Sequence, residues 1–271
     1  MQIILTHEQA DFDALASLIG AALLSEGALP LLPRKMNRNV RAYLNLYSAG
    51  LNLLEQAELP SGPVEQVTLV DTQSLVTIKG IGRNTRVRAV DHHARRADLP
   101  EGWSFEGERI GACTTLFVEK LRQENTPLEV NQATLLLLGI YEDTGSLTYA
   151  GTTARDVQAA AYLLEQGASL RIAAKYLNPP LSAEQRALCD TLLANAQSHS
   201  IQGQSIILAK ARAVELVDEI SSVAHKLRDL LDPDALFLLV QTSEGVRLVA
   251  RSTTDLVNVA EVAVQFGGGG H

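Results

Sequence analysis

The sequence predicts an α/β protein with a mostly parallel, doubly wound sheet, followed by a second, smaller α/β domain. In the first half of the chain, short apolar runs alternate with segments of helical periodicity, as expected for strands joined by helices. Acidic residues and histidines come directly after several of these runs, where the binding sites of such sheets lie. After about residue 200 the β-type runs follow one another closely, which indicates a separate domain.

Short apolar runs and helical periodicity define the elements of the first domain. The predicted strands are Gln2–Thr6, Ala28–Leu32, Val67–Val70 and Val87–Val90. The predicted helices are Asp13–Glu26, Asn39–Leu54, Cys113–Gln123, Val130–Tyr141 and 153–165. Gly27 ends the first of these helices, and the capping motif Thr153-x-x-Asp156 begins the last, which stops at Gly167.

A break at Asn178-Pro-Pro180 precedes a helix that begins at the capping motif Ser182-x-x-Gln185 and continues to about Ser198. Beyond it, Thr242–Gly245 resembles a hairpin loop. The other predicted elements are strands at Ser205–Ala209, Ala235–Gln241 and Val246–Arg251 and helices at Val214–Leu231 and Asn258–Phe266. The predicted organisation is therefore a domain over 1–181, a connector helix over 182–199, and a second domain over 200–271.

Composition and charge narrow the class of protein. Apolar residues make up 46% and charged residues 20%, which is typical of a globular protein with a substantial core. No apolar run is long enough to cross a membrane, and the first residues lack a signal-peptide pattern. The two cysteines, Cys113 and Cys189, indicate no disulfide framework and favour a cytoplasmic location.

The net charge of −8 argues against a protein that grips long duplex DNA. Basic residues nevertheless cluster in two segments, 34–41 and 83–96. These clusters fit either a solvated face or the guidance of a short anionic substrate.

Metal-binding residue types gather at predicted strand and helix ends. They are His7, Asp11 and Asp13; Asp71; Asp91, His92 and His93; and Asp143. Several have a simpler interpretation alone: Asp13 as a helix cap, Asp71 and Asp143 as turn residues, and Asp91-His92-His93 as a turn with exposed imidazoles. Their coincidence favours two divalent cations, because such a site needs a bridging carboxylate and several further oxygen or nitrogen ligands. Mixed imidazole and carboxylate ligation indicates Mn²⁺, with Mg²⁺ or Co²⁺ as alternatives.

In this order, the motifs resemble those of the DHH phosphoesterase family, named for the motif seen here as Asp91-His92-His93. The resemblance covers essentially the whole chain and implies a dinuclear hydrolase. It implies that one metal is held by His7, Asp11 and Asp71, and the other by Asp13, Asp71, His92 and Asp143, with Asp71 bridging. It also implies that His93 faces the substrate phosphate and that Asp91 orients the histidines.

The end of the chain resembles the DHH-associated domain, which implies a substrate-binding role for Arg251, Ser252, Gly268, Gly269, Gly270 and His271. Glycines let backbone N–H groups approach a phosphate, and arginine can bind it in a bidentate manner. Taken alone, the glycine run also fits a flexible tail. Because family members continue beyond this motif, we expect the domain to be truncated. The Asp11–Ser17 and Gly139–Ser146 stretches resemble the N-terminal region of bacterial proteins that also carry CBS and polynucleotide or tRNA nucleotidyltransferase domains.

The predicted function is that of a metal-dependent phosphodiesterase or exonuclease acting on dinucleotides, short single-stranded oligonucleotides or RNA 3′ ends. The expected partner is such a nucleotide or nucleic acid and not a membrane, and a homodimer stays open. One alternative is a non-catalytic, nucleotide-binding regulatory module of a nucleotidyltransferase-type protein. Another is an inorganic pyrophosphatase or exopolyphosphatase, which the glycine run makes less favoured.

Overall fold

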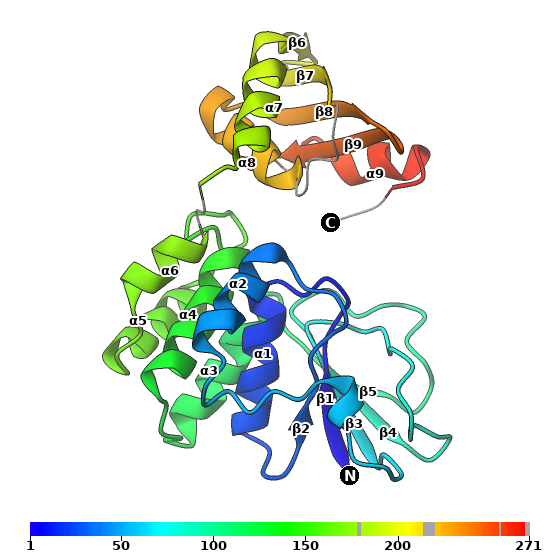
Figure 1. Cartoon of the computed structure of the whole chain (residues 1–271), viewed down its shortest axis with the longest axis vertical. Coiled ribbons are helices and arrows are strands. Elements are labelled where there is room, and N and C mark those ends of the chain that lie inside the picture. The colour runs from blue at the N-terminus through cyan, green and yellow to red at the C-terminus, as the bar shows by residue number, and fades with distance from the viewer. Residues whose placement is uncertain (178–179, 214–219, 255, 269–271) are drawn as a thin grey trace. The chain divides into compact units, whose positions relative to one another are not determined.

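The computed structural model describes residues 1–177, 180–213, 220–254 and 256–268. The chain divides into two compact units, Met1–Pro179 and Pro180–His271 (Figure 1). None of the helices in these described ranges combines the length and apolarity that crossing a bilayer requires.

The sheet of the first unit has five parallel strands in the order β2-β1-β3-β4-β5. They are β1 (Gln2–Leu5), β2 (Leu29–Pro30), β3 (Gln66–Val70), β4 (Arg86–Val90) and β5 (Ser104–Glu106). The predicted α/β class with a parallel sheet is confirmed. β5 was not predicted, because its three residues carry no period of their own and become a strand only by pairing Phe105 with Ala89 of β4.

The described helices of the first unit gather on one side of this sheet, so the helices that a doubly wound sheet carries on its second face are replaced here by loops (Figure 1). They are α1 (Phe12–Leu23), α2 (Arg38–Tyr47), α3 (Cys113–Gln123), α4 (Val130–Asp143), α5 (Ala154–Glu165) and α6 (Leu170–Leu177), with a short 3₁₀ turn η1 (Gln56–Glu58). α2 ends before the predicted Leu54, because Gly50 and Asn52 adopt positive φ and turn the chain. α6 was not predicted from the sequence.

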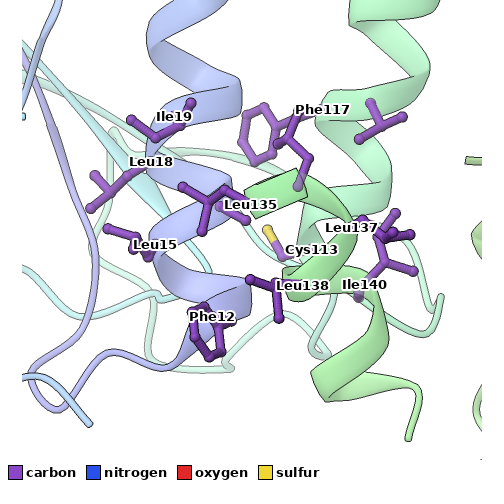
Figure 2. Packing of buried hydrophobic residues seen from close by; sticks show 14 of the residues in the cluster. Phe12, Leu15, Leu18, Ile19, Cys113, Phe117, Leu135, Leu137, Leu138 and Ile140 are labelled. Atoms are coloured by element: carbon purple, nitrogen blue, oxygen red, sulfur yellow. The ribbon is translucent and has the colours of Figure 1, made fainter. Parts of the chain in front are cut away.

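A single large core joins the helices to one face of the sheet. Its strand residues, Ile4, Val70 and Val90, alternate with residues of the opposite face. Figure 2 shows its centre, which is built from side chains of α1 such as Phe12 and Leu15, Phe117 of α3 and Leu138 of α4. Because α1, α3 and α4 are locked together here, their ends are held in fixed positions at the edge of the sheet.

The other face of the sheet is covered mainly by connecting segments. Ile3, Leu5, Val67 and Leu69 lie there in a second cluster, with partly buried residues such as Trp103 packed against it. The connections from β3 to β4 and from β4 to β5 contain no helix. These two connections begin at the strand ends that carry the sequence motifs, so they are free to form loops around a site.

The second unit is a mixed four-stranded sheet in the order β6-β7-β8-β9, with a pair of helices over one face. Its elements are α7 (Ala183–Ala194), β6 (Gln197–Ile201), β7 (Gln204–Arg212), α8 (Ile220–Leu231), β8 (Ala235–Thr242), β9 (Gly245–Ser252) and α9 (Val259–Gln265). The predicted connector helix is α7, and its Leu188 and Leu192 lie in the core of this unit. It ends earlier than predicted because Gln202 and Gly203, both at positive φ, turn residues 197–201 back as a strand against β7. The predicted segment 214–219 lies outside the described residues.

Candidate metal centre

Three neighbouring strands deliver the first candidate ligands to one edge of the sheet. β1 pairs in parallel with β3 through Leu5 and Leu69, and β3 pairs with β4 through Val70 and Val90. His7, Asp71 and the Asp91–His93 motif follow the carboxyl ends of these strands. β1 is also the strand at which the chain order reverses, since β2 lies on one side of it and β3 on the other. Ligand sites of open parallel sheets form at such a position.

Helix ends supply the remaining candidates. Asp11 caps the N-terminus of α1 by accepting a hydrogen bond from the N–H of Ala14 at 3.0 Å, and Asp143 is the last residue of α4. α4 can approach α1 and α3 because of Gly139, where a Cβ would lie 2.7 Å from the Cβ of Ala16. The Glu142 carboxylate accepts a hydrogen bond from the N–H of Phe12, which ties the end of α4 to the start of α1.

The structure brings the predicted residues together into three overlapping groups. His7, Asp11 and Asp71 form the first, Asp13, His92 and Asp143 the second, and Asp71, Asp91, His92 and His93 the third, with the possible ligand atoms of each group within 4.8 Å of one another. Asp71 links the first two: its Oδ2 is 3.4 Å from His7 Nε2, and its Oδ1 is 3.6 Å from His92 Nε2. His92 Nε2 is also 3.4 Å from Asp143 Oδ2. This grouping has the arrangement that a bridging Asp71 requires.

Asp13 is completely buried and accepts hydrogen bonds at the start of α3. Its carboxylate oxygens receive the N–H of Cys113 at 2.7 Å and the N–H of Thr114 at 2.8 Å. The cap of α1 is Asp11, so the simpler interpretation of Asp13 as a cap of its own helix does not describe this fold. Asp13 instead fixes α3 against α1 and carries its charge into the interior.

Hydrogen bonds orient the two histidines differently. His92 Nδ1 lies 3.1 Å from the carbonyl oxygen of Ile110, so it donates there, and Nε2 faces Asp71 and Asp143. His93 Nδ1 lies 2.8 Å from Asp91 Oδ1, which also accepts the His93 backbone N–H at 3.0 Å. Asp91 therefore orients His93, whereas a backbone carbonyl orients His92.

Burial and mutual repulsion oppose ionisation of the central carboxylates. Burial, followed by the charges of neighbouring aspartates, raises the pKa of Asp71 well above its ordinary value and raises the pKa of Asp143 to about 11. Burial likewise raises the pKa of Asp13. Asp91 behaves differently: burial by itself would raise its pKa, but hydrogen bonds from His93 and Gln73 lower it. The same hydrogen bond raises the pKa of His93. The three central aspartates therefore lie where a positive ion would be favourable.

These residues fit divalent cations. Asp71 Oδ1 and His92 Nε2 are buried and have no hydrogen-bond partner among the described residues, which is costly unless a ligand engages them. Carboxylate oxygens together with imidazole nitrogens are a donor set for Mn²⁺ and similar ions, whose charge would reverse the unfavourable electrostatics. Asp71 has φ of 54°, in the left-handed region that aspartate adopts more readily than most residues.

The residues assigned to substrate binding lie in the second unit. Ser252 Oγ lies 3.1 Å from the Asp234 carbonyl oxygen and 2.7 Å from that of Thr254, so its hydroxyl is engaged in the local turn. Arg251 is partly buried on β9 and donates to the carbonyl oxygen of Ala250 at 3.1 Å. Gly268 donates its N–H to the Ala263 carbonyl oxygen at 2.9 Å, at the end of α9. Gly269, Gly270 and His271 lie outside the described residues.

Sequence reasoning missed Gln73 and Glu142, which contact the candidate site without being obvious ligands. Gln73 donates to Asp91 Oδ2 at 3.0 Å. The available signal was position: Gln73 follows Asp71 by two residues at a strand end, and Glu142 precedes Asp143 directly. Neither residue type suggests a metal site by itself.

His225 of α8 should make the second unit sensitive to acid. Burial and the nearby charges of Arg251 and Arg228 lower its pKa to about 4. Because the unfolded chain binds this proton near pH 6.5, stability is complete above that pH and falls as the pH drops toward 4. At pH 4.5 we expect wild-type protein to lose about 2 kcal/mol of stability that a His225→Gln variant keeps. Hydrogen exchange of β7 and β8 amides between pH 7 and 4.5 measures this; equal pH dependence in both proteins would contradict it.

Comparison with known proteins decides the family. Residues 2–140 match the model of the DHH family, N-terminal domain. The chain belongs to the DHH family. It is 35% identical to an A-adding tRNA nucleotidyltransferase of Geobacter sulfurreducens, over 100% of this chain and 32% of the relative. It is 29% identical to the bifunctional oligoribonuclease and PAP phosphatase NrnA of Mycoplasma genitalium, over 68% of this chain and 58% of that protein.

A solved structure agrees with the fold. An exopolyphosphatase-related protein from Bacteroides fragilis superposes with a TM-score of 0.76 at 16% identity, covering 99% of this chain and 84% of that one. At this identity the likeness concerns the fold alone. The predicted family is thus confirmed, and its members include named phosphoesterases such as NrnA. The chain spans about a third of the length of the tRNA nucleotidyltransferase it matches.

Proposed function

We propose that this DHH-family chain hydrolyses phosphodiester bonds in dinucleotides or short single-stranded oligonucleotides, RNA 3′ ends included. The observation that carries the proposal is the convergence of carboxylates from α1, α4 and the strand ends around Asp71 Oδ1 and His92 Nε2, two buried atoms without a hydrogen-bond partner in the described part of the chain. Such a cluster destabilises a fold without a cation, so it favours a function that uses one.

In this proposal His7, Asp11 and Asp71 hold one divalent cation, and Asp13, His92 and Asp143 hold the second together with Asp71. Mn²⁺ is the proposed ion. When bound, the cations would neutralise charge on the phosphoryl oxygens and activate the attacking water. Asp91 binds Nδ1 of His93. In the proposal, this contact turns the opposite ring nitrogen, Nε2, toward the substrate phosphate, so Nε2 is the atom that can hold or release a proton there.

The relatives support nucleotides over pyrophosphate. NrnA is named as an oligoribonuclease, and the nucleotidyltransferase is named for tRNA. We further propose that the chain is part of a longer, cytoplasmic nucleotidyltransferase-type protein with CBS domains. The 3′ end of a nucleic acid would be a natural substrate in such a protein. Arg251, Ser252 and the terminal glycine–histidine run stay proposed as phosphate contacts, and a homodimer stays a proposal.

A second candidate is a nucleotide-binding regulatory module without turnover. It is favoured by the similarity along the whole chain to part of a tRNA nucleotidyltransferase. The complete set of predicted ligands speaks against it, because a site without catalytic use has no reason to keep every one.

The deciding experiment is hydrolysis with Mn²⁺ of a linear dinucleotide, a cyclic dinucleotide, a short RNA, pyrophosphate and polyphosphate. We expect mononucleotide release from at least one of the first three and little phosphate from the last two. Turnover of pyrophosphate or polyphosphate alone would replace the proposal with a phosphatase of those compounds. Stoichiometric Mn²⁺ binding without any turnover would favour the regulatory module.

A further inference from the structure

Gln73 connects the two loops that carry the candidate site. It lies in the loop after β3, is only 7% exposed, and makes three hydrogen bonds to the loop after β4. Its Nε2 donates to Asp91 Oδ2 at 3.0 Å and to the Ala94 carbonyl oxygen at 3.1 Å. Its Oε1 accepts the backbone N–H of Arg96 at 2.8 Å.

The chemistry of these partners fixes the orientation of the amide. A carboxylate and a carbonyl can only accept, and a backbone N–H can only donate. A flipped amide would place its oxygen against two acceptors and its nitrogen against a donor. Gln73 is therefore held in one orientation, and in it the whole donor capacity of the side chain is used.

Asp91 is consequently held from two sides. Oδ2 receives Gln73, and Oδ1 receives both the ring Nδ1 and the backbone N–H of His93. With each oxygen bound to a different residue, the carboxylate cannot rotate without breaking hydrogen bonds. Because the His93 ring is oriented by Oδ1, fixing the rotation of Asp91 fixes the ring.

We propose that Gln73 is a positioning residue, which acts through the Asp91 carboxylate to hold His93 in one ring orientation and one tautomer. The inference rests on the proposed function only for the role of His93 at the substrate phosphate. Gln73 does not hold a cation, since its three hydrogen bonds direct both amide atoms to the loop after β4.

The neighbouring Ser74 offers a matched control. Its Oγ accepts a hydrogen bond from the Arg96 guanidinium at 2.8 Å, so it also links the two loops. It is exposed, and among the described residues its side chain bonds Arg96 and not Asp91. Ser74→Ala therefore removes a connection between the same loops but leaves the support of Asp91 intact.

Gln73→Met and Ser74→Ala would be compared with wild-type chain in two measurements. Methionine fills the volume of the glutamine without its donors. In metal-free protein labelled with ¹⁵N-histidine, we expect wild type and Ser74→Ala to show one His93 tautomer with Nδ1 protonated. Gln73→Met should show an averaged ring signal. In the hydrolysis assay with Mn²⁺, we expect Gln73→Met to lower kcat about tenfold, with KM and the Mn²⁺ Kd changed less than about twofold.

Unchanged His93 resonances in Gln73→Met would overturn the proposal, as would equal kinetics in the two variants. A parallel loss of Mn²⁺ affinity and kcat would also overturn it, because it would mark collapse of the loop that carries His92. If wild-type protein hydrolysed none of the substrates, the proposed function would fail. The His93 resonances would still decide the role of Gln73.

Discussion

Asp71→Asn is expected to abolish turnover with Mn²⁺ and, at the same time, to make the metal-free protein more stable. Asp71 lies between both ligand groups, so its loss removes the shared ligand of the proposed centre. Several kcal/mol of transition-state stabilisation depend on such a centre, which corresponds to roughly 10³-fold in kcat. Asparagine is the suitable replacement because it tolerates the φ of 54° better than alanine.

The gain in stability follows from the electrostatics. Burial and neighbouring aspartates raise the pKa of Asp71. At a pH above the ordinary pKa of aspartate, the metal-free fold is therefore destabilised relative to the unfolded chain, in which this carboxyl ionises freely. An amide removes that penalty. Thermal unfolding at pH 7 and Mn²⁺ titration of both proteins measure the two effects. Asp190→Asn, which removes an exposed charge from α7, is the control and should change neither. Full activity in Asp71→Asn would refute the dinuclear assignment.

Removal of divalent cations should have an effect of similar size. Treatment with a chelator is expected to abolish turnover, and Mn²⁺ should restore it more fully than Mg²⁺. Stability should change in parallel, because a ligand that binds only the folded state stabilises it by mass action. Activity and the unfolding temperature would be followed together during Mn²⁺ titration.

The pH dependence provides a separate check on the metal-free form. The pKa of Asp143 is raised to about 11, so its folded state retains a proton that the unfolded chain releases near pH 4. The contribution of this proton to the stability of the fold is complete below about pH 4 and is lost as the pH rises toward 11. Metal-free protein should therefore lose stability between pH 5 and 9, as measured by thermal unfolding, and protein loaded with Mn²⁺ should not. Identical profiles would show that the carboxylates bind no cation.

Much of the fold was predictable because its signals are local. α3 has the predicted bounds, and the predicted capping motif begins α5 where Thr153 donates its N–H to Asp156 at 2.7 Å. Besides helix α6, sequence reasoning missed β5 and β6, which are strands of three and five residues that exist through pairing with a neighbour. A short strand has no pattern long enough to separate it from a loop.

The sequence by itself determined the chemistry available to this protein: a parallel α/β sheet whose strand ends carry histidines and aspartates. Residue types and apolar periodicity suffice for that. Only the tertiary structure decided how those side chains are used. Asp13 bonds Thr114, which lies 101 positions away, and Gln73 bonds Asp91, which lies 18 positions away. The tautomer of His92 depends on the carbonyl of Ile110. Contacts of this kind arise when packing of the helices and strands brings distant segments together, and no local pattern of residues records them.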